Sequence, residues 1–191
     1  ANTYYGKSLE KEPNNEQALF GYGQSAYYND DLKKARTSFE KLIEVNPENS
    51  FGWAYLGKLE GDDENYAVAT RHIEKALELD PYYYDYWVDY GRYLYYQGKF
   101  ADAEKAWTKA ISIEPDNFYA YIYRSALYDE QKRFADALND YKKIIEVKPE
   151  YYYAYESIGI LAWHEKKYDE ARKAFLNAYK YNKDNISYPM M

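Results

Sequence analysis

The side chains that most often carry out catalysis are sparse in this sequence. It contains no cysteine and two histidines, His72 and His164, which lie far apart along the chain. Neither histidine belongs to an H-E-x-x-H motif, so the ligand spacing of a zinc site is missing. The nine glycines occur singly, which leaves no glycine-rich loop to hold a phosphate. We interpret both histidines as surface residues, and the sequence predicts neither a metal site nor a cofactor.

Acidic residues are numerous but do not mark out a catalytic pair. The 32 Asp and Glu residues are scattered, in spacings such as Glu170–Lys173 that support a helix locally. The densest group, Gly61-Asp62-Asp63-Glu64, lacks the D-x-D-x-D-G order of a calcium loop. We interpret it as the solvated end of a shortened helix, with a flexible joint or a cation site as the alternative. No catalytic arrangement stands out, so the sequence predicts a protein that is not an enzyme.

Charge and composition narrow the class of partner. The net charge is −7, from 25 basic and 32 acidic residues. Negative charge disfavours nucleic acids and anionic membrane surfaces, and no apolar run approaches the roughly 18 residues of a membrane-spanning helix. The chain has 28 tyrosines against seven phenylalanines and four tryptophans. Tyrosine suits half-buried surfaces because its ring is apolar and its tip is polar.

A repeat of 34 residues organises these side chains. Five prolines recur at that interval: Pro13, Pro47, Pro81, Pro115 and Pro149. In the central unit, Trp87, Tyr90, Gly91 and Leu94 fall on one face of a predicted helix, and Ala103, Trp107, Ala110 and Ile111 fall on one face of a second. The turn Gln97-Gly98-Lys99 separates the two helices, and the residue before each proline ends the second one.

Small and large residues recur at matching places in the units. One small series is Gly23, Gly57, Gly91, Ser125 and Gly159, and a second is Ala35, Ala69, Ala103, Ala137 and Ala171. The large series are Leu19, Trp53, Trp87, Tyr121, Tyr155, and Phe39, Ile73, Trp107, Tyr141, Phe175. We expect the large side chains to pack into the gaps left by the small ones, so that each helix pair packs on itself and on the next.

This pattern resembles the tetratricopeptide-repeat family, through the Trp87, Tyr90, Gly91, Leu94 run and the Ala103, Trp107, Ala110 run with its closing Pro115. The resemblance implies an all-α fold, a right-handed α-solenoid of antiparallel helix pairs that forms a single domain over 1–191. We expect a partial helix in 1–15, five repeats at 16–49, 50–83, 84–117, 118–151 and 152–185, and a tail at 186–191 in which Pro189 prevents a further helix. The chain lacks an initial Met and begins in the middle of a unit, so we expect it to be a piece of a longer chain.

Three departures from the repeat pattern lead to specific expectations. Glu60 stands where large apolar residues are usual, and Arg124 stands where its neighbouring units have Tyr90 and Leu56. We expect Arg124 to find a carboxylate or to extend toward solvent. The helix predicted over Tyr168–Tyr181 has no polar helix after it, so we expect it to present an uncovered aromatic face.

The family resemblance also implies where a ligand binds. In tetratricopeptide-repeat proteins the first helices of successive units line a concave groove. The positions that correspond to it here are mainly tyrosines: Tyr27, Tyr28, Tyr55, Lys58, Asp89, Arg92, Tyr95, Tyr96, Tyr119, Tyr123, Tyr153 and Trp163. Members that clamp a terminal carboxylate use Lys, Arg and Asn at fixed groove positions, and here Phe20, Gln24, Tyr55, Asp85 and Asp89 occupy them. That kind of ligand is therefore not expected.

We therefore predict a non-catalytic scaffold that binds a peptide or protein segment in a tyrosine-rich groove. The alternative is a structural segment of a larger protein that associates with other copies through its terminal helices. A weaker third hypothesis is a site at which exposed tyrosine and tryptophan rings stack on sugars or other flat ligands.

Overall fold

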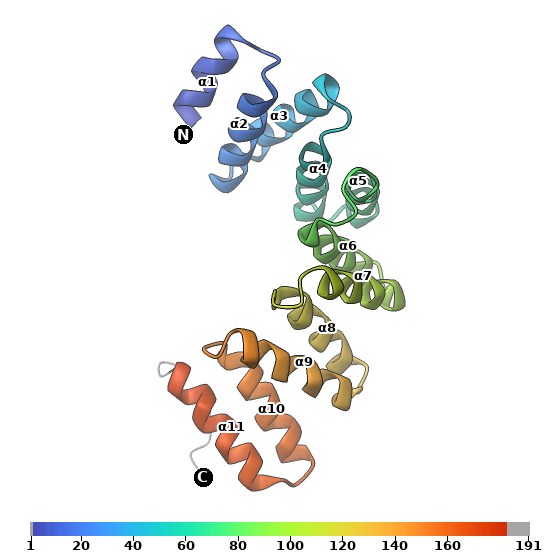
Figure 1. Ribbon diagram of the computed structural model, residues 1–191, viewed down its shortest axis with the longest axis vertical. Coiled ribbons are helices and arrows are strands. Elements are labelled where there is room, and N and C mark those ends of the chain that lie inside the picture. Colours follow the sequence, from blue (N-terminus) through green and yellow to red (C-terminus); the bar gives the residue numbers. More distant parts are fainter. Residues whose placement is uncertain (1, 183–191) are drawn as a thin grey trace. The chain divides into compact units, whose positions relative to one another are not determined.

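The computed structural model describes residues 2–182, and eleven α-helices account for the regular structure of that range (Figure 1). Their bounds are α1 Asn2–Lys11, α2 Glu16–Tyr28, α3 Leu32–Val45, α4 Ser50–Asp62, α5 Tyr66–Leu79, α6 Tyr84–Tyr96, α7 Phe100–Ile113, α8 Tyr119–Glu130, α9 Phe134–Val147, α10 Tyr152–His164 and α11 Tyr168–Tyr181. The chain forms two compact units, 1–106 and 107–191, which divide within α7. The tail expected at 186–191 lies outside the described residues.

The helix pairs are bounded by the turn residues that the repeat supplies. Asn15 and Asn49 cap α2 and α4, where their side chains accept hydrogen bonds from the N–H groups of Ala18 and Gly52. At the other end, the residue before each proline, such as Asn46, is extended and ends the second helix of its pair. The helix predicted over Tyr168–Tyr181 coincides with α11.

The turn inside each pair contains one residue with a left-handed backbone. These residues are again 34 apart: Asp30, Glu64, Gly98, Lys132 and Lys166, with φ between 58° and 73°. A left-handed backbone is most favourable for glycine and is unfavourable for most other residue types. The same backbone conformation recurs in all five turns, although only the third turn has a glycine there.

In residues 1–106 the core includes two successive layers. Leu19, Phe39, Leu42, Tyr55 and Leu59 are buried among α2, α3 and α4. The next layer, among α4, α5 and α6, includes Ile73, Leu77, Tyr86 and Tyr93. Each layer uses both helices of one pair and the first helix of the next pair, as expected for a repeat in which neighbouring pairs bury each other's apolar faces.

The matching of small and large residues is confirmed within both units. A Cβ atom on Gly23 would lie 2.9 Å from the Phe39 ring, and one on Gly57 would lie 2.9 Å from Ile73. In residues 107–191, a Cβ atom on Gly159 would lie 2.6 Å from Phe175. That unit has a core of Tyr121, Tyr128, Tyr141, Ile144 and Ala154, built from α8, α9 and α10.

The structure answers three expectations from the sequence, for the helix before the acidic turn, for Glu60 and for Arg124. The helix before the acidic turn is not shortened, since α4 has 13 residues, as do α2, α6 and α10. Glu60 forms an ion pair with Arg36, which also contacts Asp63 at 2.8 Å. The expectation that Arg124 finds a carboxylate is confirmed, because its Nε and Nη2 donate to the two oxygens of Asp140 at 2.9 and 2.8 Å.

Candidate functional site

Polar contacts join the first helices of successive pairs in residues 1–106. Helices α2, α4 and α6 are in contact in sequence order. The Gln24 Nε2 atom donates to the Tyr55 hydroxyl at 2.8 Å, and the Lys58 Nζ atom lies 3.4 Å from Asp89 Oδ2. Both contacts join residues 31 apart in sequence, so they are the same contact in successive repeats. We call this row of residues, completed by Arg92, the polar ladder.

The α6 end of the polar ladder places one carboxylate between two cations. Asp89 is only 8% exposed, and its second oxygen accepts from Arg92 Nη2 at 2.9 Å. The same Nη2 lies 3.0 Å from the Tyr93 hydroxyl. A buried carboxylate requires such partners, since its desolvation is otherwise costly. Lys58 and Arg92, two of the predicted groove residues, are thus already engaged with Asp89.

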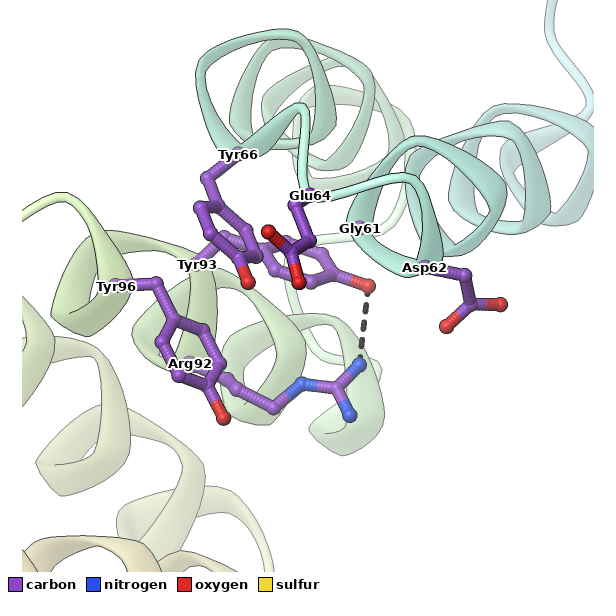
Figure 2. Close-up of a pocket in the computed structure, with 7 residues that line it drawn as sticks. All are labelled: Gly61, Asp62, Glu64, Tyr66, Arg92, Tyr93 and Tyr96. Atoms are coloured by element: carbon purple, nitrogen blue, oxygen red, sulfur yellow. Dashed lines mark hydrogen bonds between the residues drawn. The ribbon is translucent and has the colours of Figure 1, made fainter.

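Beside this ladder lies a pocket of about 220 Å³ (Figure 2). It is lined by the end of α4 and the following turn, the first residue of α5, and one face of α6: Gly61, Asp62, Glu64, Tyr66, Arg92, Tyr93 and Tyr96. We call this set the tyrosine pocket. The Tyr66 ring stacks on Tyr96 with 4.8 Å between centroids, and lies 6.4 Å from the buried Tyr93 ring. The pocket therefore has aromatic walls that come from two helix pairs.

Neighbouring groups fix the position of these walls. The Gln97 amide donates to the carbonyl oxygens of Tyr66 and Tyr93, both at 3.1 Å, and so ties the end of α6 to the start of α5. Gly61 lets the Tyr93 ring approach, because a Cβ atom there would lie 2.3 Å from it. Burial raises the pKa of Tyr66 and of Tyr93, so both phenols stay neutral at physiological pH and offer uncharged π-faces.

The acidic residues of the pocket are available to solvent. The exposed Glu64 carboxylate makes no hydrogen bond or ion pair with any described residue. Asp62 Oδ2 accepts from the Tyr27 hydroxyl at 2.7 Å, and burial followed by this contact raises the pKa of Tyr27. Asp63 pairs with Arg36. Within residues 2–182, no three His, Cys, Asp or Glu side chains are placed to hold a metal ion.

The tyrosines predicted to line a groove in residues 1–106 differ in their surroundings. Tyr28 and Tyr96 are 72% and 55% exposed. Tyr55 is buried, with its ring stacked on Phe39 at 4.7 Å. Tyr27 and Tyr95 are half-buried. Tyr28 and Tyr96 therefore offer the largest free surface of this set, and Tyr55 contributes mainly to the core.

In residues 107–191, three of the four predicted groove residues are exposed. Tyr119, Tyr153 and Trp163 are 53%, 52% and 42% exposed. Tyr123 is half-buried and stacks on Trp107 with 5.8 Å between centroids. Tyr119 stacks on Phe118 at 4.5 Å, and Trp163 meets Tyr168 edge to face at 5.0 Å. Tyr119, Tyr153 and Trp163 therefore offer exposed rings within this unit.

The sequence did not point to Glu64, Tyr66 or Tyr93 as site residues. Tyr66 and Glu64 belong to the turn and the second helix, whereas the groove rule considers first helices. Gly61 was the signal available in the sequence. At the same position of three other units the chain has an aromatic residue: Tyr27, Tyr95 and Trp163. A missing side chain next to an acidic turn leaves space that a ring from the following unit can enter.

His72 also differs from expectation, as it is half-buried and stacks on Trp53 at 5.7 Å.

Comparison with known families accounts for this architecture. Tetratricopeptide-repeat sequence profiles match residues 17–49, 55–107, 88–146 and 125–185, which is most of the chain. The chain belongs to the tetratricopeptide-repeat family. Proteins of this family are scaffolds for protein–protein interaction and are generally not catalytic. As to membranes, none of the helices within residues 2–182 is long and apolar enough to span one.

Individual relatives of this repeat protein agree with that assignment. It is 36% identical over 58 residues to a TPR repeat-containing protein of Methanocaldococcus jannaschii, covering 30% of this chain and 17% of that protein. The chain thus spans about a sixth of that relative's length.

Solved structures with the same fold cover nearly the whole chain. MamA has a TM-score of 0.76 at 23% identity, over 92% of this chain and 96% of MamA. YrrB, described as a TPR protein with an unusual peptide-binding site, has a TM-score of 0.74 at 16% identity, over 97% and 95%. PilF of Pseudomonas aeruginosa has a TM-score of 0.80 at 18% identity, over 89% and 78%. At these low sequence identities, the comparison shows that the fold is shared.

Proposed function

We propose that the first-helix face of residues 1–106, formed by α2, α4 and α6, binds an extended segment of a partner protein. The observation that carries this proposal is the pair of exposed rings, Tyr28 on α2 and Tyr96 on α6, the two outer helices that the polar ladder connects. Tyrosine gives large contact area at a small entropy cost, and is enriched among residues that dominate binding energy. The face is a binding surface, and the repeat protein carries no reaction of its own.

The polar ladder supports this role because it makes the face rigid before the partner arrives. Gln24, Lys58 and Asp89 each contact a residue on the neighbouring first helix. Side chains that are already ordered lose less entropy on binding, so more of the contact energy appears as affinity. YrrB, which shares the fold, is described as having a peptide-binding site, and this is consistent with the same use of the repeat here.

The proposal is tested by selecting ligands from a random library, which does not require the natural partner. Peptides of about 12 residues displayed on phage are selected on the immobilised 191-residue chain, and the peptides recovered are synthesised. Hydrogen exchange of the saturated complex then maps the site. We expect slower exchange in α2, α4 and α6, measured on peptic fragments. Protection confined to α3 and α5, or to residues 107–182, would contradict the proposal.

A second candidate function rests on α11. Its exposed apolar side chains include Tyr168, Leu176 and Tyr179, which are 54%, 58% and 49% exposed. An apolar helix face of this kind favours association with a second copy. Sedimentation velocity across a concentration series tests it, and Tyr179→Lys should weaken any association seen. If the protein is a monomer at all concentrations, self-association is refuted and peptide binding is the remaining proposed function.

A further inference from the structure

The tyrosine pocket has the chemistry of a receptor for one basic side chain. It is lined by two carboxylate residues, Asp62 and Glu64, and by the rings of Tyr66, Tyr93 and Tyr96 (Figure 2). We propose that this pocket binds an arginine side chain of the partner segment. The inference rests on the proposed function, since it names the ligand chemistry of that same face.

The size of the pocket suits a single side chain. Its volume of about 220 Å³ is below the roughly 300–1,000 Å³ typical of sites for drug-sized ligands. It lies on the face of the unit where Tyr96 of α6 is exposed. A peptide that crosses α6 at Tyr96 can therefore place one side chain in the pocket while its backbone stays outside.

The charges around the pocket favour a cation over an anion. Asp62, Glu64 and Arg92 line it, and Arg92 shares the Asp89 carboxylate with Lys58. Both cations are paired with Asp89, at 3.4 and 2.9 Å. Arg92 lies 5.0 Å over the Tyr93 ring, so this pocket already holds one guanidinium against a tyrosine. An entering carboxylate would meet Glu64 and Asp62, whose charges no lysine or arginine ion pair offsets within the described residues.

The flat aromatic walls favour arginine over lysine. A guanidinium is planar, stacks on aromatic faces and donates in several directions, whereas an ammonium is a compact and strongly hydrated point charge. Tyr96, which is 55% exposed, and the exposed Glu64 both line the pocket, from α6 and from the turn before α5. A guanidinium that stacks on the Tyr96 ring therefore has a carboxylate acceptor in the same pocket.

The experiment uses small probes, so it does not depend on finding the natural partner. The ¹⁵N-labelled 191-residue chain is titrated separately with the N-acetyl methylamides of arginine, lysine, norleucine and glutamate. We expect the arginine probe to shift the backbone amide signals of Gly61, Glu64, Tyr66 and Tyr93, and to do so at lower concentration than lysine. No shift with arginine, or equal shifts with norleucine or glutamate, would overturn the proposal.

Three variants distinguish arginine binding in the pocket from a general effect of charge on binding. Glu64→Gln should weaken arginine binding about threefold, and Glu64→Gln with Asp62→Asn about tenfold, as expected for partly exposed ion pairs. Asp30→Asn is the matched control, because Asp30 occupies the same turn position one repeat earlier, with the same φ of 61°, and does not line the pocket. It should leave arginine binding unchanged. Equal weakening in the Asp30 and Glu64 variants would count against the pocket.

The result is independent of the selection experiment on the whole face. Peptides that protect α2, α4 and α6 but bind equally well to wild type and to Glu64→Gln would refute the arginine pocket and leave the proposed function standing. Arginine shifts in the pocket, with no peptide recovered by selection, would support the pocket and count against the proposed face.

Discussion

The Tyr93 ring lies directly over the Cα atom of Gly61, close enough that a Cβ atom on Gly61 would be 2.3 Å from the ring. Gly61 lies at the end of the first helix of one pair and Tyr93 lies on the first helix of the next. Tyr93 is buried and lines the tyrosine pocket. The contact between Gly61 and Tyr93 therefore both packs two repeats together and shapes the candidate site.

The first prediction follows from that contact. Gly61→Ala forces the Tyr93 ring to move, and overpacking of this kind usually lowers the free energy of unfolding by about 1–3 kcal/mol. Urea unfolding followed by circular dichroism measures the change. Gly6→Ala is the control, because a Cβ atom there would meet nothing closer than 3.7 Å. An unaltered midpoint for Gly61→Ala would show that Tyr93 is not held against this position.

The second prediction concerns the left-handed turn residues. Lys132 has a φ of 58°, so Lys132→Gly removes a strain of about 1 kcal/mol, part of which is lost again to glycine's greater freedom in the unfolded chain. A net gain of about 0.5 kcal/mol is expected. Lys132→Ala keeps a Cβ atom in the same strained backbone and should change little. Thermal unfolding compares the three proteins.

The reverse change is expected at Gly98. Its φ is 73° and a Cβ atom would contact nothing within 4 Å. Gly98→Ala therefore tests backbone strain without a steric clash, and should destabilise by about 1 kcal/mol. A stability equal to wild type would argue that the turn relaxes to another backbone conformation.

A third prediction concerns the buried ion pair of Arg124 and Asp140. Their side chains are 15% and 5% exposed, so Arg124→Leu leaves a nearly buried carboxylate without its partner and should cost about 3–5 kcal/mol. Arg124→Tyr with Asp140→Ala replaces the pair by the residues that the central unit has at these positions, Tyr90 and Ala106. This double variant should be much closer to wild type. Urea unfolding of each variant measures the difference, and equal losses would contradict the pairing.

The fourth prediction concerns pH. Burial raises the pKa of Asp129, one of whose oxygens is buried without a hydrogen bond. A carboxyl group whose pKa is raised by folding stabilises the protein below its unfolded pKa of about 3.9 and loses that contribution as pH rises through the folded value. Asp129→Asn should therefore gain stability relative to wild type at pH 7, and the gain should shrink toward pH 4. A difference that grows on acidification would contradict the assignment.

The architecture was predictable because the same sequence pattern specifies the same helix pair in each of several repeats. The contacts of Gly23 with Phe39 and of Gly57 with Ile73 could be predicted, because a small residue and a large residue recur at the same two positions of each unit. The pairing of Arg124 was also predictable, because a charge on a packing face has few stable options.

The details of the site were not predictable in the same way. Tyr55 and Tyr28 have the same residue type and both lie on first helices, yet one is buried against Phe39 and the other is 72% exposed. Which ring is buried depends on the neighbours it meets in the adjacent pair. The tyrosine pocket exists because Gly61 is small and Tyr93 is long, and a rule for positions within one repeat does not contain that relationship between two repeats.

The measurement that tests the central claim most directly compares two double variants, each of which removes two exposed tyrosine rings. The dissociation constant of a selected peptide, measured by fluorescence anisotropy, is compared for Tyr28→Ala with Tyr96→Ala and for Tyr119→Ala with Tyr153→Ala, after equal helicity and melting are confirmed. We predict that the first variant weakens binding by about tenfold or more and that the second has little effect. Unchanged affinity in the first variant would contradict a peptide site on α2, α4 and α6.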